Sequence, residues 1–243
     1  MDRVITIAAS IVASRYPGAL AAFAAGSLVR GEGTAYSDLD LVVVFRELPN
    51  AYRESFRFDG LPIEAFVHDT ETLAFFFHEL DRRSGIPALP QMVLEGIEIP
   101  RSTPESQALK TLAKSVIDMG PPPLADDELL QMRYEISDAL DDLRAPRSYG
   151  EGVATGARLF DALANFYFRA SGRWSAAGKS VPRKLAVADP DLSRRYDAAF
   201  EALFMRGDAQ AVVALGEELL LVAGGPLFEG YRRDAPAAWR KAT

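Results

Sequence analysis

A run of three prolines behind a glycine, Gly120 to Pro123, interrupts the chain close to its midpoint. Proline fixes φ and has no amide hydrogen, so neither a helix nor an inner strand continues through such a run. Consecutive prolines instead form a stiff, extended connector. The sequence therefore predicts two domains, residues 1–120 and 124–243.

The first half mixes short apolar runs with helical patterns. Apolar residues recur at helical spacing over 3–15, and this helix should end before Pro17-Gly18. The runs 19–25 and 39–45 predict buried strands, because the first is short and bounded by turn residues and the second is β-branched and apolar. After a polar stretch, 46–60, the run 61–67 predicts another strand.

Two more helices are expected before the prolines. Asp69 or Thr70 can cap a helix over 71–80. Its inward positions would be Leu73, Phe76, Phe77 and Leu80. Thr103-Pro104-Glu105 starts a second helix that reaches about residue 118, with proline in its first turn. The intervening region 84–101 contains three prolines and gives no clear pattern.

After the prolines, apolar residues keep helical spacing almost throughout. Four amphipathic helices are expected, over residues 129–143, 159–170, 192–203 and 212–222. The segment 171–185 is interpreted as a loop between the second and the third. The sequence therefore predicts an α+β protein, in which a domain with a small mixed sheet flanked by helices precedes a C-terminal helical bundle.

The amino-acid composition excludes several classes of protein. Of the 243 residues, 49% are hydrophobic and 25% charged, as in ordinary globular proteins, and no cysteine is present for disulfides or thiolate zinc sites. A net charge of −7 argues against a protein that grips nucleic acid. The N-terminus resembles neither a signal peptide nor a membrane span, so a cytoplasmic protein without a membrane partner is expected. A homodimer is left open.

Two aspartates stand at the start of the predicted strand 39–45. Side chains alternate along a strand, so Asp38 and Asp40 point to the same side and repel each other unless a cation lies between them. Magnesium prefers a few carboxylates together with phosphate oxygens and water. Glu64 lies on the next predicted strand and can face the same cleft. The pattern predicts a metal site formed by Asp38, Asp40 and Glu64.

A Gly-Ser pair precedes these acids by ten residues. Gly26 permits a tight turn and a close approach to a ligand, and Ser27 places a hydroxyl beside exposed amides. Arg30 is near enough in sequence to reach the same phosphates. Taken singly, each of these features is explained as well by a turn, a loop cap or an exposed strand residue. Their combination at this spacing favours a nucleotide site.

Gly-Ser, ten residues, and Asp-Leu-Asp at the start of an apolar strand resemble the signature of the nucleotidyltransferase superfamily with the DNA polymerase β-like fold. The resemblance is close over about residues 20–68 and looser in the helical half. Glu64, in PIEAFVHD, occupies the place of the third family carboxylate and looks like the glutamate strand of the aminoglycoside adenylyltransferases. No acceptor-recognition motif of those enzymes can be matched in the second half.

This resemblance implies an activity. Asp38 and Asp40 would hold Mg²⁺ on the triphosphate of ATP or another NTP, and Gly26 and Ser27 would contact its outer phosphates. Glu64 would deprotonate the acceptor, help to bind a second metal, or do both. The expected reaction is magnesium-dependent transfer of a nucleoside monophosphate, AMP from ATP, to a hydroxyl of a small molecule, with aminoglycoside-like compounds as candidates.

Other assignments stay open. A basic segment without acidic residues contains Arg169, Arg173, Lys179, Arg183 and Lys184. Lys179 in it is a candidate to close over the triphosphate, although a solvated basic loop explains the segment about as well. The rival functions are modification (AMPylation) of a protein and a non-catalytic nucleotide-binding regulator or antitoxin. The two histidines, His68 and His78, do not have metal-ligand spacing.

Overall fold

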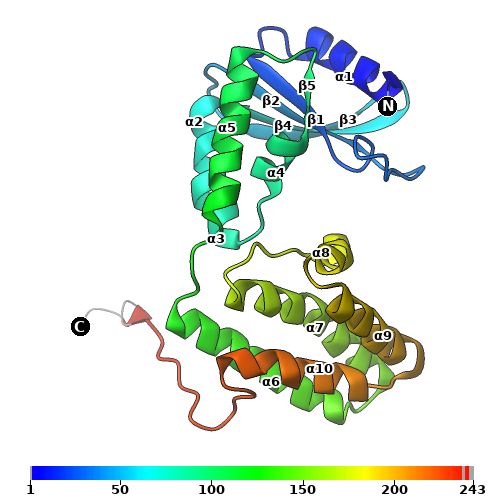
Figure 1. Ribbon diagram of the computed structural model, residues 1–243, viewed down its shortest axis with the longest axis vertical. Coiled ribbons are helices and arrows are strands. Elements are labelled where there is room, and N and C mark those ends of the chain that lie inside the picture. Colours follow the sequence, from blue (N-terminus) through cyan, green and yellow to red (C-terminus); the bar gives the residue numbers. More distant parts are fainter. Residues whose placement is uncertain (1, 237–238, 241–243) are drawn as a thin grey trace. The chain divides into compact units, whose positions relative to one another are not determined.

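The structure is a computed structural model that describes residues 2–236 and 239–240. The chain divides into two compact units, Met1–Pro122 and Pro123–Thr243 (Figure 1). The first unit contains a sheet and helices and the second is helical, so the predicted α+β class is confirmed.

A five-stranded sheet forms the centre of the first unit. Its strand order is β3-β4-β2-β1-β5. The strands are β1 (Ala21–Ala25), β2 (Leu39–Phe45), β3 (Tyr52–Phe58), β4 (Leu61–Asp69) and β5 (Ile97–Ile99). β2 and β4 pair in parallel, whereas the other neighbours are antiparallel. The sheet is therefore mixed, and its central strands include the three that the apolar runs predict.

β3 corrects the interpretation of 46–60 as a polar stretch without a strand. Phe56 and Phe58 are half-buried and alternate with exposed residues, which is the period of a strand with one buried face. Asp59 and Gly60 have φ values of 48° and 79° and form the two-residue turn into β4. Arg53 and Arg57 at exposed positions, and Glu54 at a half-buried position, hide this pattern. β5 lies in the region that gave no assignment.

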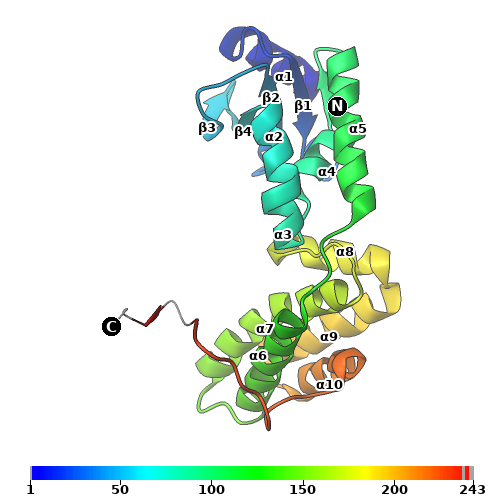
Figure 2. The same cartoon turned by 90° about the vertical axis from the view of Figure 1, so that its left-hand side faces the viewer.

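The helices of the first unit surround the sheet. They are α1 (Asp2–Arg15), α2 (Thr70–Phe75), the π-helical turn η1 (Phe76–Asp81), α3 (Arg82–Ser84), α4 (Ala88–Glu95) and α5 (Pro104–Met119). α1 lies on one side of the sheet and α4 on the other (Figures 1 and 2). Asp69 caps α2 by accepting a 2.8 Å hydrogen bond from the amide of Thr72, and Thr103 caps α5.

One predicted inward position is wrong. Leu80 is 44% exposed, whereas Leu73 and Phe77 are buried as expected. The helix that begins at Thr70 widens into a π-helix from Phe76 onward. A π-helical turn holds more residues than an α-helical one, so the phase of the buried stripe shifts after Phe77.

The two faces of the sheet follow strand alternation. Leu39, Leu41 and Val43 of β2 belong to a buried cluster with Ile7 and Ile11 of α1. Residues of β2 at the intervening positions therefore face away from α1. This opposite face carries the candidate site at one end of the strand.

The second unit has its own hydrophobic core. Its helices are α6 (Asp126–Arg144), α7 (Tyr149–Ala170), α8 (Val181–Ala188), α9 (Pro190–Arg206) and α10 (Gln210–Leu220), with the 3₁₀ turns η2 (Gly178–Ser180) and η3 (Leu221–Ala223). The four predicted helices are confirmed. The expected loop 171–185 is wrong in part, because α8 begins at Val181 with Pro182 in its first turn, and the helix buries Val181 and Leu185 fully.

Across the described part of the chain, every helix is too short or too polar to cross a membrane.

Candidate active site

Parallel pairing of β2 and β4 brings two acids side by side. In this register Asp40 and Glu64 are direct Cα partners. Asp38 precedes β2 and lies two residues before Asp40, so it points to the same face. The apolar neighbours Leu39 and Ile63 point to the α1 side, where they are buried. The alternation that fills the core therefore also gathers the acids on the other face.

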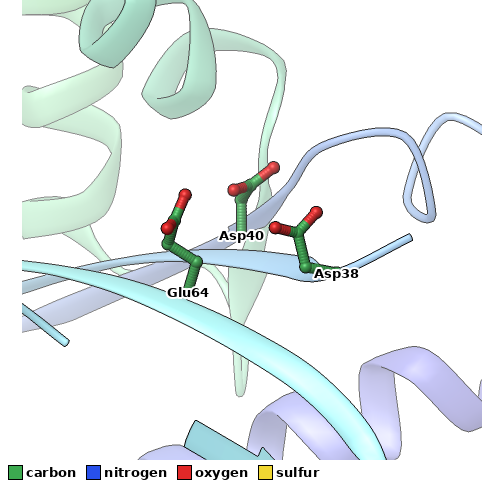
Figure 3. A group of neighbouring side chains, drawn as sticks. All are labelled: Asp38, Asp40 and Glu64. Atoms are coloured by element: carbon green, nitrogen blue, oxygen red, sulfur yellow. The ribbon is translucent and has the colours of Figure 1, made fainter. Parts of the chain in front are cut away.

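The three carboxylates converge (Figure 3). Asp38, Asp40 and Glu64 each offer one oxygen such that these atoms lie within 4.8 Å of one another, and all three residues are half-buried. Oxygen ligands on opposite sides of a Mg²⁺ or Ca²⁺ ion are about 4–5 Å apart. The three acids thus fit a divalent cation, which would also relieve their mutual repulsion.

Gly26 ends β1 directly against Asp40. Its φ is +87°, and a β-carbon built there would lie 2.2 Å from Oδ2 of Asp40. Ala25, the preceding residue, is the Cα partner of Asp40 across the β1–β2 ladder. A side chain at position 26 would therefore displace the carboxylate. The close approach that the sequence assigned to a ligand is in this structure an approach to an acid of the site.

The loop between β1 and β2 is tied internally. The hydroxyl of Ser27 donates to the hydroxyl oxygen of Ser37 over 3.2 Å, and Ser37 also accepts from the amide of Thr34 over 2.8 Å. Nε of Arg30 donates to Glu32 over 3.1 Å on the exposed side of this loop. Ser27 is thus bonded to Ser37, the residue that precedes Asp38, whereas Arg30 is paired locally.

Lys179 lies in η2 of the second unit, where it is exposed. The roles assigned to Ser27, Arg30 and Lys179 in nucleotide binding stay predictions.

Arg53 is a site residue that the sequence analysis missed. It lies on β3 and forms an ion pair with Oε1 of Glu64, while its guanidinium lies 4.9 Å from the ring centroid of Phe66. Recognising β3 from its alternation would have placed Arg53 and Glu64 on the same face of neighbouring strands. Which residue of β4 lies nearest to Arg53 still depends on the register between β3 and β4, and this register cannot be read from the sequence of either strand alone.

His68 follows Glu64 on β4 but has a structural environment. It is 3% exposed, and its ring packs edge-on against Phe76 with centroids 4.7 Å apart. Burial lowers the pKa of its imidazole, and the nearby Asp69 opposes this in part. The neutral ring is therefore favoured inside the fold.

Comparison with known protein families finds a match within the first unit. Residues 5–87 match the family of nucleotidyltransferase domains. Among solved structures, a nucleotidyltransferase-like protein from Exiguobacterium sibiricum 255-15 is similar, with 16% identity, a TM-score of 0.44, and coverage of 89% of this chain and 74% of that one. No curated protein matches the chain. Asp38, Asp40 and Glu64 all fall within the matched residues, so the acid triad lies in the part of the first unit that is similar to nucleotidyltransferase domains.

Proposed function

We propose that the protein is a magnesium-dependent enzyme that transfers AMP from ATP to a hydroxyl group of a small molecule. The observation that carries this proposal is the convergence of three carboxylates within 4.8 Å inside the matched domain. Three acids held this close, on strands whose register fixes them, are costly for the fold unless a cation joins them. Nucleotidyl transfer uses such a cation to neutralise a triphosphate.

Asp38 and Asp40 are the residues that would hold the metal. Bound there with the nucleotide, the ion would neutralise the phosphate charge and polarise the phosphoryl group under attack. Because Gly26 has no side chain, the carboxylate of Asp40 fits against the backbone at the end of β1. The adjacent Ser27 would offer its hydroxyl and its amide to phosphate oxygens. These residues contribute by placing the α-phosphate in line with the acceptor.

Glu64 is the candidate general base. Its carboxylate would take the proton from the acceptor hydroxyl as the hydroxyl oxygen forms a bond to the α-phosphorus. The bond from that phosphorus to the bridging oxygen breaks, and pyrophosphate leaves with the electron pair. Atoms and charge balance without a further reactant. The position of Glu64 supports this role, because Glu64 lies opposite Asp40 in the ladder but on a different strand.

The acceptor class is the finer part of the proposal. Hydroxylated small molecules, aminoglycosides among them, are the first candidates, following the resemblance of the glutamate strand. Transfer to a protein hydroxyl uses the same chemistry at the same three acids. The acid triad favours catalysis over a regulator that only binds nucleotide.

Asp40→Asn tests the proposal. The wild-type protein, incubated with α-phosphate-labelled ATP, Mg²⁺ and a panel of hydroxylated compounds, should label at least one of them. Asp40→Asn should lower the rate at least about 100-fold, because the isosteric amide cannot replace a metal-binding carboxylate. Asp59→Asn, at the exposed β3–β4 turn, is the matched control and should keep the wild-type rate.

Each other outcome is decisive. An Asp40→Asn protein with wild-type activity would remove the proposed site. Label that appears on protein instead of on the compounds would assign a protein acceptor. Nucleotide binding without transfer to either would assign a regulator.

A further inference from the structure

Arg53 reaches Glu64 from the edge strand of the sheet. In the β3–β4 ladder Ser55 is the Cα partner of Glu64, and Arg53 is the partner of Phe66. Arg53 therefore approaches Glu64 along the diagonal between neighbouring strands, a distance that a long side chain spans. Its Nη2 forms an ion pair with Oε1 of Glu64.

The guanidinium is held on two sides. Besides the ion pair, its central carbon lies 4.9 Å from the ring centroid of Phe66. Aromatic faces attract a guanidinium, and its planar shape stacks there in a way that a lysine ammonium cannot. The acid end of the pair is the more sheltered one, because the side chain of Glu64 is 20% exposed and that of Arg53 60%. This sheltering strengthens the pair relative to one in open solvent.

The pair makes the three carboxylates of the site unequal. Asp38, Asp40 and Glu64 can all reach one ion, yet Oε1 of Glu64 is already engaged by a fixed positive charge. A metal ion that recruits Glu64 as a full ligand would have to compete with Arg53 for the same carboxylate. Asp38, just before β2, and Asp40, on β2, are not part of this pair.

We propose that Arg53 is a positioning residue: its ion pair with Glu64 keeps that carboxylate from acting as a full ligand of the metal ion. Without nucleotide, Asp38 and Asp40 bind a divalent ion, while Arg53 engages Oε1 of Glu64 and offsets its negative charge, so that Glu64 is a weak ligand although it lies within reach of the ion. The second carboxylate oxygen of Glu64 is left to accept a proton. This inference rests on the proposed function, because it presumes that the acids form a metal site. It assigns the base role to Glu64 over the role of a permanent metal ligand.

Mn²⁺ binding to the full-length protein without nucleotide tests the inference, with free Mn²⁺ followed by electron paramagnetic resonance. Arg53→Gln should bind Mn²⁺ about tenfold more tightly than wild type, because the third carboxylate becomes available to the ion. Arg53→Lys keeps the charge but not the stacking on Phe66, so its Mn²⁺ affinity should lie between those of wild type and Arg53→Gln. A residue that only supports the fold would leave affinity unchanged or weaken it.

Arg57→Gln is the matched control. Arg57 lies on the same face of β3, two residues from Ser55, and bonds the carbonyl of Gly60 instead of an acid of the site. The Arg57→Gln variant removes the same charge from the same strand. Loss of a solvent-screened positive charge by itself should change Mn²⁺ affinity less than about threefold. The double variant Arg53→Gln/Glu64→Gln should return to wild-type affinity, because the freed carboxylate is gone.

Three results would overturn the inference: an Arg53→Gln affinity equal to or below wild type, an equal gain in Arg57→Gln, or a double variant that keeps the tighter binding. Asp40→Asn separates this failure from failure of the proposed function. If Asp40→Asn loses Mn²⁺ and Arg53→Gln binds like wild type, only the role of Arg53 is wrong. If Asp40→Asn binds Mn²⁺ like wild type, the metal site itself is wrong and the inference falls with it.

Discussion

The backbone of Gly26 lies so close to Asp40 that a β-carbon would sit 2.2 Å from Oδ2 of its carboxylate. The positive φ of Gly26 is a second reason for glycine at this position. The two reasons are separable, because Gly31 in the same loop also has a positive φ, +77°, but has open space around its missing side chain.

Gly26→Ala should therefore damage the site more than the fold. The new methyl group forces the carboxylate of Asp40 away from Asp38 and Glu64, so we expect Mn²⁺ affinity and nucleotidyl transfer to fall at least about tenfold. Gly31→Ala should lower the free energy of unfolding by about 1 kcal/mol, the cost of a left-handed residue, and keep both site properties. Titration with Mn²⁺ and urea unfolding of the two variants measure this difference. Equal Mn²⁺ affinities in the two variants would contradict the role given to the close approach.

At the scale of elements, the end of β4 is packed beneath the helix that follows it. His68 is buried there against Phe76, the first residue of the π-helical turn. Its Nδ1 has no hydrogen-bond partner among the described residues. Protonation would place a charge in this buried contact, and an N–H at Nδ1 would find no acceptor among the described residues.

The stability of the protein should therefore fall between pH 7 and pH 5. Burial lowers the pKa of His68 below its usual 6.5, so the unfolded chain binds more protons than the folded one in this range. The contribution of His68 is fully present above pH 6.5 and is lost as the pH falls, with a slope of at most about 1.4 kcal/mol per pH unit.

Urea unfolding at pH 5, 6 and 7 measures this slope. His68→Phe keeps an aromatic ring in the contact and should flatten the dependence, whereas His78→Gln, at a half-buried position, should keep the wild-type slope. A His68→Phe protein with the wild-type slope would show that another group titrates.

Local patterns predicted most elements of the fold but not the relations between them. The apolar runs of β1, β2 and β4 and the periodic helices of the second unit need only their own residues to be recognised. β3 escaped because Arg53 and Arg57 on its exposed face made the stretch look like a loop. The phase shift at Leu80 escaped because a π-helical turn has no clear mark in the sequence.

The candidate site divides in the same way. Asp38 directly precedes β2 and Asp40 lies on it, so the alternation of an extended chain alone puts them on one face. Placing Glu64 beside them required the assumption that its strand pairs with β2, and the ladder of β2 with β4 has this pairing. Predicting Arg53 as a site residue would have required two registers, that of β3 with β4 and that of β4 with β2. Long-range pairing of this kind is set by the packed sheet as a whole.

At the scale of the whole molecule, the residues that the structure describes form two hydrophobic cores and one acid triad. Leu140 and Leu159 belong to a buried cluster formed by residues of the second unit, whereas the core around α1 and the sheet contains residues of the first. All three acids lie in the first unit. Stability of the second core and metal affinity of the triad should therefore respond to different substitutions.

Leu140→Ala should show this separation. Leu140 is 1% exposed, and its loss leaves a cavity that should lower the free energy of unfolding of the second unit by about 2–5 kcal/mol. Mn²⁺ affinity in the folded protein should stay at the wild-type value. Leu221→Ala, at a position that is 68% exposed, is the control and should change neither quantity. A Leu140→Ala protein that is folded but has lost Mn²⁺ binding would contradict the separation.

The alternation of side chains along β4 also limits which insertions and deletions the gene for such a domain can accept. Glu64 stands four positions after Gly60, the last residue of the hairpin turn. Deleting or inserting one codon between them would rotate the glutamate into the apolar layer against α1 and expose Ile63 or Ala65 in its place. Insertions or deletions in this segment that preserve activity must therefore change its length by an even number of residues. The connection from Arg46 to Ala51, which precedes the hairpin, can change by one residue without moving Glu64 to the other face.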